Sequence, residues 1–362
     1  MNDSGTVQES GSFSLPRRLG DYELLAEMGR GGMGVIYRAR QGGLNRLCAV
    51  KMLHQQGSFT GPEAEEALRA EAAGAARLDH PNIVGIYEVG RAEGRLFFSM
   101  ELVEGVSLAE YTRERVLDAL EIARIAAVIA EAIAYAHGAG VWHHDLKPAN
   151  VLIDRQGRPQ VTDFGLARRV DDARRADPGR GAGSPNYLAP EQASARFGEP
   201  GPRADVFGLG AILYFLLTDR APFRGETPED TLRAVRETDP VRPRALRTGV
   251  PEELEVICLR CLEKRPSRRY ASPADVADEL NRFRRHEPIL ARPAGPVERL
   301  RKWRRRHPAI AAWSATMAAL LAVLATGATL AAVRIDRDRQ RAAESEAGAR
   351  RSLYSAELAL AL

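Results

Sequence analysis

The sequence is poor in cysteine, with only Cys48, Cys258 and Cys261 among its 362 residues. Three cysteines exclude a disulfide-stapled scaffold and are ordinary for a protein kept in a reducing compartment. Cys258 and Cys261 form a C-x-x-C motif, but the second pair that a structural zinc site needs is missing. The apolar residues around this motif predict a buried helix, namely Leu254, Ile257, Leu259 and Leu262. We therefore expect these two thiols to pack in a core rather than to bind metal.

The N-terminus lacks the positively charged start and the apolar stretch of a secretory signal. Residues 1–20 are mostly Ser, Gly and other polar residues, and we expect a disordered leader there. The chain also lacks a strong charge excess, because 52 Lys and Arg against 48 Asp and Glu give a net charge of +4. The excess is concentrated in residues 299–306, next to an apolar run, which favours a membrane surface as partner and no nucleic acid.

Residues 21–103 contain short β-rich runs broken by Gly and polar turns, with one Ala- and Glu-rich helical stretch at residues 62–78. This pattern predicts a small, mostly antiparallel sheet that carries one helix. From residue 104 to 284 the pattern changes to long amphipathic helices, and in residues 119–136 isoleucines recur at helical spacing. We therefore predict an α+β chain with a small sheet lobe, a larger mainly helical lobe and a join near residues 101–104.

Residues 285–308 form a predicted linker that is rich in Pro and polar residues and ends in a basic run. The next twenty-five residues, 309–333, carry no formal charge. At about 1.5 Å per residue this length suffices to cross a bilayer core of about 30 Å, which predicts a single transmembrane helix. A buried Ala-rich helix of a soluble domain is the alternative. Such a helix would show a polar stripe over this length, whereas here only Ser314, Thr316, Thr326 and Thr329 interrupt the apolar sequence.

Basic residues precede this apolar segment, whereas residues 334–362 mix Arg with Asp and are expected to form a charged, helical tail. Because positive residues stay on the cytoplasmic side, we expect a single-pass protein of the inner cell membrane with its catalytic domain in the cytoplasm. The twenty-nine residues after Val333 (362 minus 333) are too few for a sensor domain. We therefore expect a larger external part beyond Leu362.

A glycine-rich segment lies between two strand-like runs, Met28-Gly29-Arg30-Gly31-Gly32-Met33-Gly34-Val35, and Ile36 follows it. We interpret the segment as a G-x-G-x-x-G-x-V motif. Glycines let the backbone fold tightly over phosphates, and their N–H groups point at anionic oxygens without a Cβ in the way. The motif alone also fits an ordinary glycine-rich hairpin. A dinucleotide-binding turn would open a helix, whereas Val35-Ile36-Tyr37 continues as a strand.

Lys51 ends the apolar run Cys48-Ala49-Val50, and Glu71 follows twenty residues later on the predicted helix. A lysine can grip the α- and β-phosphates of a nucleotide when a carboxylate orients its flexible side chain. A solvated surface pair is the alternative for any Lys and Glu. The apolar residues before Lys51 favour the first interpretation, because they place it in a strand that faces the cleft.

Two motifs decide the function: His143-His144-Asp145-Leu146-Lys147-Pro148-Ala149-Asn150 and, after a short hairpin, Asp163-Phe164-Gly165. Phosphoryl transfer needs a carboxylate for the proton of the attacking hydroxyl and oxygen ligands for Mg²⁺. Asp145 suits the first task, while Asn150 and Asp163 suit the second. Both motifs follow the glycine-rich segment and Lys51 in this order, which a chance arrangement does not explain.

With these motifs, residues 21–284 resemble the protein kinase superfamily, specifically bacterial Ser/Thr kinases with a single membrane span. The resemblance implies the two-lobed kinase fold, ATP and Mg²⁺ (or Mn²⁺) as cofactors, protein substrates with Ser or Thr hydroxyls, and a homodimer through the small lobe or the membrane segment. For the nucleotide it implies that residues 28–36 cover ATP, that Lys51 pairs with Glu71, that Ala49 and Val35 enclose adenine, that Met100 guards the back pocket, and that the backbone of Glu101 and Val103 meets the adenine edge.

In the large lobe, the resemblance implies that Lys147 contacts the transferred phosphate, as in Ser/Thr rather than Tyr kinases. Residues 183–191 are expected to be the substrate-facing end of the activation segment. The resemblance further implies that Glu191 pairs with Arg269 and that Asp205 holds the catalytic loop, residues 143–150, from below.

The sequence departs from the family pattern at His144, because an Arg usually precedes the catalytic Asp. The change removes the permanent guanidinium that pairs with a phosphorylated activation loop. Residues 166–183 also contain no Ser, Thr or Tyr. We therefore hypothesise that activation-loop phosphorylation does not gate this protein. Either internal ion pairs between Arg and Asp order the loop, or the loop is solvated.

A pseudokinase scaffold that binds nucleotide or partners without turnover is the alternative function. Such proteins commonly lose the nucleotide-gripping Lys, the catalytic Asp or a metal ligand, yet Lys51, Asp145, Asn150 and Asp163 are all present. We therefore predict an ATP-dependent Ser/Thr protein kinase that acts in membrane-linked signalling.

Overall fold

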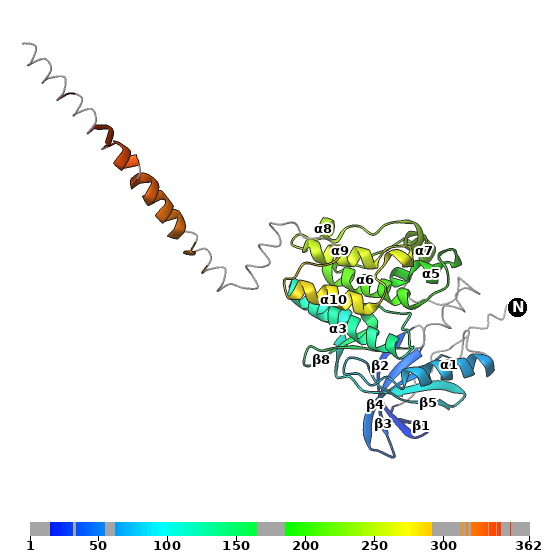
Figure 1. The fold of residues 1–362 in the computed structure, drawn as a ribbon. Coiled ribbons are helices and arrows are strands. Elements are labelled where there is room, and N and C mark those ends of the chain that lie inside the picture. The colour runs from blue at the N-terminus through cyan, green and yellow to red at the C-terminus, as the bar shows by residue number, and fades with distance from the viewer. Residues whose placement is uncertain are drawn as a thin grey trace, which may run out of the picture. The chain divides into compact units, whose positions relative to one another are not determined.

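The computed structural model describes residues 15–31, 34–54, 62–164 and 185–291, and shorter stretches further on, which are 313, 316–317, 320–331, 333–337, 339–341 and 348. In the helix that begins at Pro62, side chains are described at residues 66, 69 and 70 and from Ala72 onward. The chain divides into two compact units, Met1–Ala294 and Gly295–Leu362. The first unit contains both predicted lobes (Figure 1).

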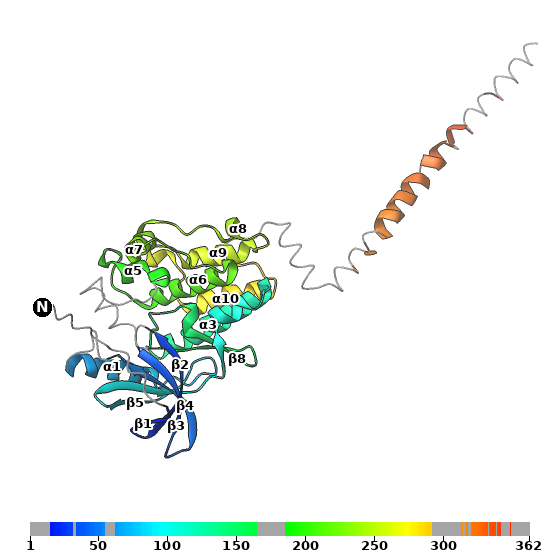
Figure 2. The ribbon, with the colours of Figure 1, turned by 180° about the vertical axis from the view of Figure 1, so that it is seen from behind.

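The small lobe is a six-stranded antiparallel sheet with strand order β1-β2-β3-β4-β6-β5. Its strands are β1 (Arg17–Leu19), β2 (Tyr22–Gly31), β3 (Gly34–Gln41), β4 (Arg46–Leu53), β5 (Ile86–Ala92) and β6 (Arg95–Met100). Helix α1 (Pro62–Ala75) contacts β5 and lies beside the sheet in both views (Figures 1 and 2). The predicted sheet with one helix is therefore confirmed.

The leader predicted over residues 1–20 is too long, because Arg17–Leu19 form strand β1. This strand pairs with β2, where Leu19 lies opposite Tyr22, and both side chains are buried. The burial of these two apolar side chains explains why the end of the segment is ordered. Residues 1–14 lie outside the described residues.

Strand register sorts the side chains of the small lobe onto two faces, because successive residues of a strand point to opposite sides. On one face Lys51 lies opposite Ile36 and Phe98, and Ala49 lies opposite Met100. The apolar cluster on this face also contains Ala72 of α1 and Val103. The other face carries a separate cluster, which includes Leu24, Val35, Tyr37, Val50, Met52 and Phe97.

The large lobe is mainly helical. Its α-helices are α2 (Leu108–Arg113), α3 (Ala119–Gly138), α5 (Pro190–Ala193), α6 (Pro202–Thr218), α7 (Pro228–Glu237), α8 (Pro243–Leu246), α9 (Glu252–Cys261) and α10 (Pro273–Arg284). Short 3₁₀ helices lie at η1 (Pro148–Asn150), η2 (Pro185–Tyr187), η3 (Ala195–Phe197) and η4 (Pro266–Arg268). A small antiparallel sheet contains β7 (Gly105–Ser107), β8 (Val151–Asp154) and β9 (Pro159–Val161).

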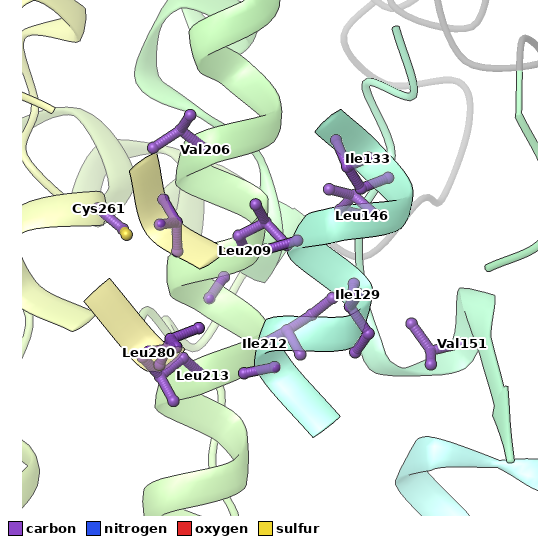
Figure 3. Close-up of a cluster of buried hydrophobic side chains, with 14 of the residues drawn as sticks. Ile129, Ile133, Leu146, Val151, Val206, Leu209, Ile212, Leu213, Cys261 and Leu280 are labelled. Atoms are coloured by element: carbon purple, nitrogen blue, oxygen red, sulfur yellow. The ribbon is translucent and has the colours of Figure 1, made fainter. Parts of the chain in front are cut away.

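Helices α3 and α6 form the centre of the large lobe (Figure 3). Asp118 immediately precedes helix α3, and its carboxylate accepts the backbone N–H of Glu121 at 2.8 Å and so caps the helix. The buried side chains between the two helices and their neighbours include Ile129, Ile133, Leu146, Val151, Leu209, Ile212, Leu213 and Leu280. Each such side chain contributes about 1.5–3 kcal/mol by burial. This core fixes the two helices that hold the catalytic loop.

The C-x-x-C motif lies in α9, and both of its side chains are fully buried. The thiol of Cys258 donates to the carbonyl oxygen of Gly210 at 3.5 Å. Burial raises the pKa of Cys258 well above its usual value and that of Cys261 to about 12. The two thiols are therefore protonated core residues, as the sequence predicted.

Helix α10 ends at Arg284, but the chain after it stays on the large lobe. Ile289 is buried in the core, and the carboxylate of Glu279 accepts the backbone N–H groups of Leu290 and of the next residue at 2.7 and 2.8 Å. The prediction of a linker over residues 285–308 is therefore wrong for its first seven residues. The remainder of that range lies outside the described residues.

The described residues of the second unit are helical, and the longest continuous stretch is 320–331. Large apolar side chains in this stretch are exposed, namely Leu320, Leu321, Val323, Leu324 and Leu330. The hydroxyls of Thr326 and Thr329 donate to carbonyl oxygens one turn earlier in the helix, at 2.7 and 3.1 Å. Among the described stretches, no helix is both long and apolar enough to cross a membrane.

Candidate active site

The catalytic loop at residues 143–150 is anchored on Asp205, a buried residue in the first turn of α6. One carboxylate oxygen of Asp205 accepts the backbone N–H of His144 at 2.6 Å, and the other accepts that of His143 at 2.8 Å. His137, at the end of α3, donates from Nε2 to the second oxygen at 2.7 Å. Burial raises the pKa of Asp205, but the hydrogen bond from His137 and the neighbouring imidazoles bring it below its usual value. The ionised carboxylate thus holds the loop from below.

Helix α6 approaches this loop closely because residue 208 is glycine. A Cβ at Gly208 would lie 2.6 Å from the Cβ of Leu146, closer than Cβ atoms come in real structures. Any larger residue would push the catalytic loop away from Asp205.

The side chain of His143 links the catalytic loop to the segment that contains Asp163. Its Nδ1 accepts the backbone N–H of Asp145 at 3.2 Å, and its Nε2 donates to the carbonyl oxygen of Thr162 at 2.9 Å. These two partners require the tautomer with the proton on Nε2. The ring also packs against Phe164, with ring centroids 4.7 Å apart. His143 therefore fixes Asp145 relative to Asp163.

Lys147 and Asn150 converge on the carboxylate of Asp145. Lys147 Nζ lies 2.5 Å from Asp145 Oδ2. Asn150 Nδ2 donates to the same oxygen at 3.1 Å and to the Asp145 carbonyl at 2.9 Å. The side chains of Asp145 and Lys147 are each 16% exposed, so a substrate hydroxyl can reach them. Because the amide nitrogen of Asn150 faces Asp145, its amide oxygen is the atom that can bind a cation.

Lys51 on β4 forms an ion pair with Asp163, and Nζ lies 2.7 Å from Oδ1. Asp163 has a φ of 67°, a strained conformation for a residue other than glycine. Burial raises the pKa of Asp163, but the charge and hydrogen bond of Lys51, with the charge of Lys147, hold it below its usual value. The predicted partner Glu71 lies in α1 with its side chain outside the described residues, so that pairing stays a prediction.

Asn150 and Asp163 supply oxygen atoms, the ligands that Mg²⁺ prefers, and Mg²⁺ is usually held by one or two side chains together with phosphate oxygens and water. Within the described ranges, no cluster of three or more His, Cys, Asp or Glu residues can hold a metal ion by itself. The donor set therefore fits a magnesium ion that is bound together with a nucleotide. It does not fit a metal held by protein side chains alone.

The predicted adenine-binding residues Ala49, Met100 and Val103 are buried in one cluster on the Lys51 face of the sheet. The backbone N–H of Glu101 donates to the carbonyl oxygen of Gly85 at 2.9 Å. The carbonyl of Glu101 is therefore the backbone group that suits the edge of an adenine. Behind Met100 lies a cavity of only about 10 Å³, lined by Ala75, Ile83, Val84, Ile86, Phe98, Thr162, Asp163 and Phe164.

The side chain of Val35 does not lie where the sequence predicted it, beside adenine. The register of β3 places Ile36 opposite Lys51, whereas Val35 lies opposite Met52. Because side chains alternate along a strand, Ile36 shares the face of Lys51 and Ala49, and Val35 packs in the cluster on the other face. The last position of the G-x-G-x-x-G-x-V motif is therefore Ile36, two residues after Gly34.

The glycine-rich segment forms the hairpin between β2 and β3, in which Gly31 pairs with Gly34. A strand follows the glycines, as predicted, and this excludes a dinucleotide-binding turn. A Cβ at Gly34 would lie 2.0 Å from the carbonyl oxygen of Met52, so only glycine fits there. Gly32 and Met33 lie outside the described residues.

On the β2 side of the hairpin, Gly29 and Gly31 leave open space around the backbone. A Cβ at Gly29 would meet nothing within 4 Å, and Met28 is exposed. Arg30 Nη2 pairs with Glu27 Oε2 at 2.9 Å on the surface. The contact of these residues with phosphates stays a prediction.

Glu191 at the start of α5 forms a buried, two-pronged ion pair with Arg269, at 2.6 and 2.7 Å. This is the pairing that the sequence resemblance implied. Sequence reasoning missed the next residue, Gln192, whose Nε2 donates to the carbonyl oxygen of His144 at 2.6 Å. In the sequence, the only signal for a role of Gln192 was its position directly after Glu191. Residues 165–184 lie outside the described residues, so the hypothesis about activation-loop phosphorylation stays a prediction.

Comparison with known proteins agrees with this geometry. Residues 22–280 match the family model of the protein kinase domain. The chain belongs to the protein kinase family. It is 37% identical over 264 residues to the serine/threonine-protein kinase PrkC of Bacillus subtilis, a match that covers 72% of this chain and 40% of PrkC. It is 35% identical over 284 residues to the serine/threonine-protein kinase PknB of Mycobacterium tuberculosis, which covers 76% and 45% of the two chains.

The kinase domain also resembles solved structures. The crystal structure of the PknI kinase domain of Mycobacterium tuberculosis superposes with a TM-score of 0.60 at 25% identity, over 75% of this chain and 98% of that one. The two-lobed kinase fold predicted from the sequence is thereby confirmed. The chain spans less than half the length of the curated relatives that it matches, between 38% and 45%.

Proposed function

We propose that this kinase domain transfers the γ-phosphoryl group of ATP to Ser or Thr hydroxyls of proteins. The observation that carries the proposal is the meeting of Lys147 and Asn150 at Asp145, beside the ion pair between Lys51 and Asp163. To these five residues we assign proton acceptance, metal binding and the neutralisation of phosphate charge in the transfer reaction. The names of PrkC and PknB, both serine/threonine-protein kinases, support the choice of hydroxyl.

In the reaction, the substrate oxygen forms a bond to the γ-phosphorus, and the bond between that phosphorus and the β–γ bridging oxygen breaks to release ADP. Asp145 accepts the hydroxyl proton through the carboxylate oxygen that Asn150 and Lys147 orient. To the ammonium of Lys147, which contacts Asp145, we assign the stabilisation of negative charge on the transferred group. Bound Mg²⁺, or Mn²⁺ with the same oxygen ligands, neutralises charge on the phosphates, and Asn150 and Asp163 are the side chains that would hold it.

Lys51 orients the nucleotide from the small lobe. Its ammonium lies on the same sheet face as Ala49 and Ile36, between the adenine-binding cluster and Asp163. A lysine placed there neutralises the α- and β-phosphates of ATP and keeps Asp163 ionised for the metal. Through its contact with Asp163, Lys51 thus connects the residues for the phosphates with the residue for the metal.

The test is incubation of the purified protein with radiolabelled ATP, Mg²⁺ and a generic basic protein. We expect label on Ser and Thr with wild type and none with Asp145→Asn or Lys51→Met, each shown to be folded by its thermal unfolding. A wild type as inactive as Lys51→Met, although both are folded, would instead support the pseudokinase scaffold.

We propose further that residues 309–333 span the inner membrane once, with the kinase domain on the cytoplasmic side. The exposed apolar side chains of the helical stretch 320–331 support this, since exposed apolar residues favour lipid over water. The intrahelical hydrogen bonds of Thr326 and Thr329 also support it, because they satisfy two polar groups that lipid cannot. A homodimer stays a prediction.

The membrane proposal is tested by fractionating cells that make the full chain. We expect it in membranes washed with alkaline carbonate, and we expect Leu321→Arg/Leu324→Arg to be released, because each charge at mid-membrane costs about 2.5–3.5 kcal/mol. The matched control is Leu44→Arg on the exposed surface of the kinase domain, which should stay with the membrane. Wild type in the soluble fraction would refute the span.

A further inference from the structure

The backbone of the catalytic loop is strained immediately before Asp145. His144 has a φ of 62°, in the left-handed region that residues other than glycine seldom adopt. Such a conformation costs about 1–3 kcal/mol and persists only where surrounding contacts over-determine it. Contacts from the surrounding structure must therefore hold His144, and its peptide groups set the position of the catalytic carboxylate.

Both polar backbone atoms of His144 are held by side chains from the large lobe. Its N–H donates to Asp205 at 2.6 Å, from below the loop. Its carbonyl oxygen accepts from Nε2 of Gln192, also at 2.6 Å. His144 is 6% exposed and Gln192 is 8% exposed, so water competes little with either hydrogen bond.

The amide of Gln192 has a second partner, which fixes its orientation. Its Oε1 accepts the backbone N–H of Ala189 at 3.0 Å, just before α5. The oxygen must therefore face Ala189, and the NH₂ group must face the carbonyl of His144. One uncharged side chain thus connects the start of α5 to the peptide that precedes Asp145.

We propose that Gln192 is a positioning residue for phosphoryl transfer, which sets the orientation of Asp145 by holding the carbonyl of His144. This inference rests on the proposed kinase function. It identifies a connection between α5 and the catalytic loop that requires no phosphate and no guanidinium. This fits a chain with His rather than Arg at position 144 and no Ser, Thr or Tyr in residues 166–183.

The substitution Gln192→Glu removes the hydrogen bond to His144 and keeps the one from Ala189. An ionised carboxylate still accepts from Ala189 but cannot donate to the carbonyl of His144, and it repels that carbonyl at close range. A protonated carboxyl has an O–H that can donate to it. Burial raises the pKa of such a carboxyl, so the lost hydrogen bond should return as the pH is lowered.

The experiment measures kcat and the KM for ATP from about pH 6 to 8.5 for wild type, Gln192→Glu, Gln192→Met and Gln156→Glu, because proton transfer and carboxyl titration both fall in such a window. Methionine has a similar shape and makes neither hydrogen bond. Gln156 lies in the exposed turn between β8 and β9, so its variant adds the same charge without the buried contact. Thermal unfolding at each pH establishes that the compared proteins are folded.

We expect Gln192→Glu to lower kcat about tenfold at pH 8 with the KM for ATP unchanged, as for a catalytic group moved slightly out of position. The ratio of its kcat to that of wild type should rise as the pH falls. Gln192→Met should lower kcat by a similar factor at every pH. The kcat of Gln156→Glu should equal that of wild type.

The inference is overturned if folded Gln192→Glu has the kcat of wild type at pH 8, or if its loss does not change with pH. Should Gln192→Glu fail to fold at pH 8, a wild-type kcat in folded Gln192→Met overturns the inference by itself. An inactive wild type would refute the kinase function, and the positioning role with it. An active wild type beside unaffected Gln192 variants refutes the positioning role alone.

Discussion

Removal of the Arg269 side chain should destabilise the kinase domain strongly. The guanidinium is fully buried and makes two hydrogen bonds to Glu191, with further bonds to the carbonyl oxygens of Arg203, Glu263 and Lys264. Arg269→Met keeps most of the volume but leaves a buried carboxylate without its counter-charge. Breaking a buried pair in this way costs about 3–5 kcal/mol. The free energy of unfolding, measured by urea titration, should fall by that amount.

The double variant Arg269→Met/Glu191→Met should lose less than the sum of the two single variants, because no unpaired charge remains. The control is Arg233→Met, which breaks an exposed pair with Asp230 and should change the free energy of unfolding by less than about 0.5 kcal/mol. A loss below about 1 kcal/mol for Arg269→Met, or additive losses in the double variant, would refute the reasoning.

Three further predictions follow from the geometry. Ile36→Ala should raise the KM for ATP severalfold, whereas Val35→Ala should leave it unchanged and lower only the stability, because the two side chains lie on opposite faces; equal effects on KM in steady-state assays would contradict the strand register. Gly34→Ala should destabilise the domain by about 1–3 kcal/mol through overpacking, and Gly31→Ala should leave the melting temperature unchanged, because only the first Cβ meets a backbone oxygen. The lowered pKa of Asp205 means that its contribution to stability is fully present above its usual pKa and is lost as the pH falls through the lowered folded value. Asp205→Asn should therefore be less stable than wild type at pH 7, and urea titrations from about pH 6 down to 3 should show the difference narrowing; a constant difference would show that Asp205 does not titrate with folding.

The residues that meet in the candidate active site could be found from the sequence because they lie in short motifs. Lys147 and Asn150 are two and five positions from Asp145, and a short loop can bring them together only in a few ways. The ion pair of Lys51 with Asp163 joins residues 112 positions apart, and only the fold shows it. The roles proposed for these residues followed from their chemistry, while their contacts required the structure.

The wrong placement of Val35 shows that the sequence alone did not predict which face of the strand a side chain occupies. A strand has a period of two, so an error of one residue moves a side chain to the opposite face. The face is fixed by the pairing of Ile36 with Lys51, which depends on the geometry of two hairpins. Gln192 was missed for a related reason, because its partner lies 48 positions away and residue 192 lies just outside the motifs recognised in the sequence.

The space behind Met100 restricts which small molecules can occupy this kinase. The cavity there, about 10 Å³, has room for about one water molecule, and Met100 and Phe164 are among the residues that line it. A compound with a bulky group directed toward α1 must first displace Met100, and truncation of that one side chain would admit it.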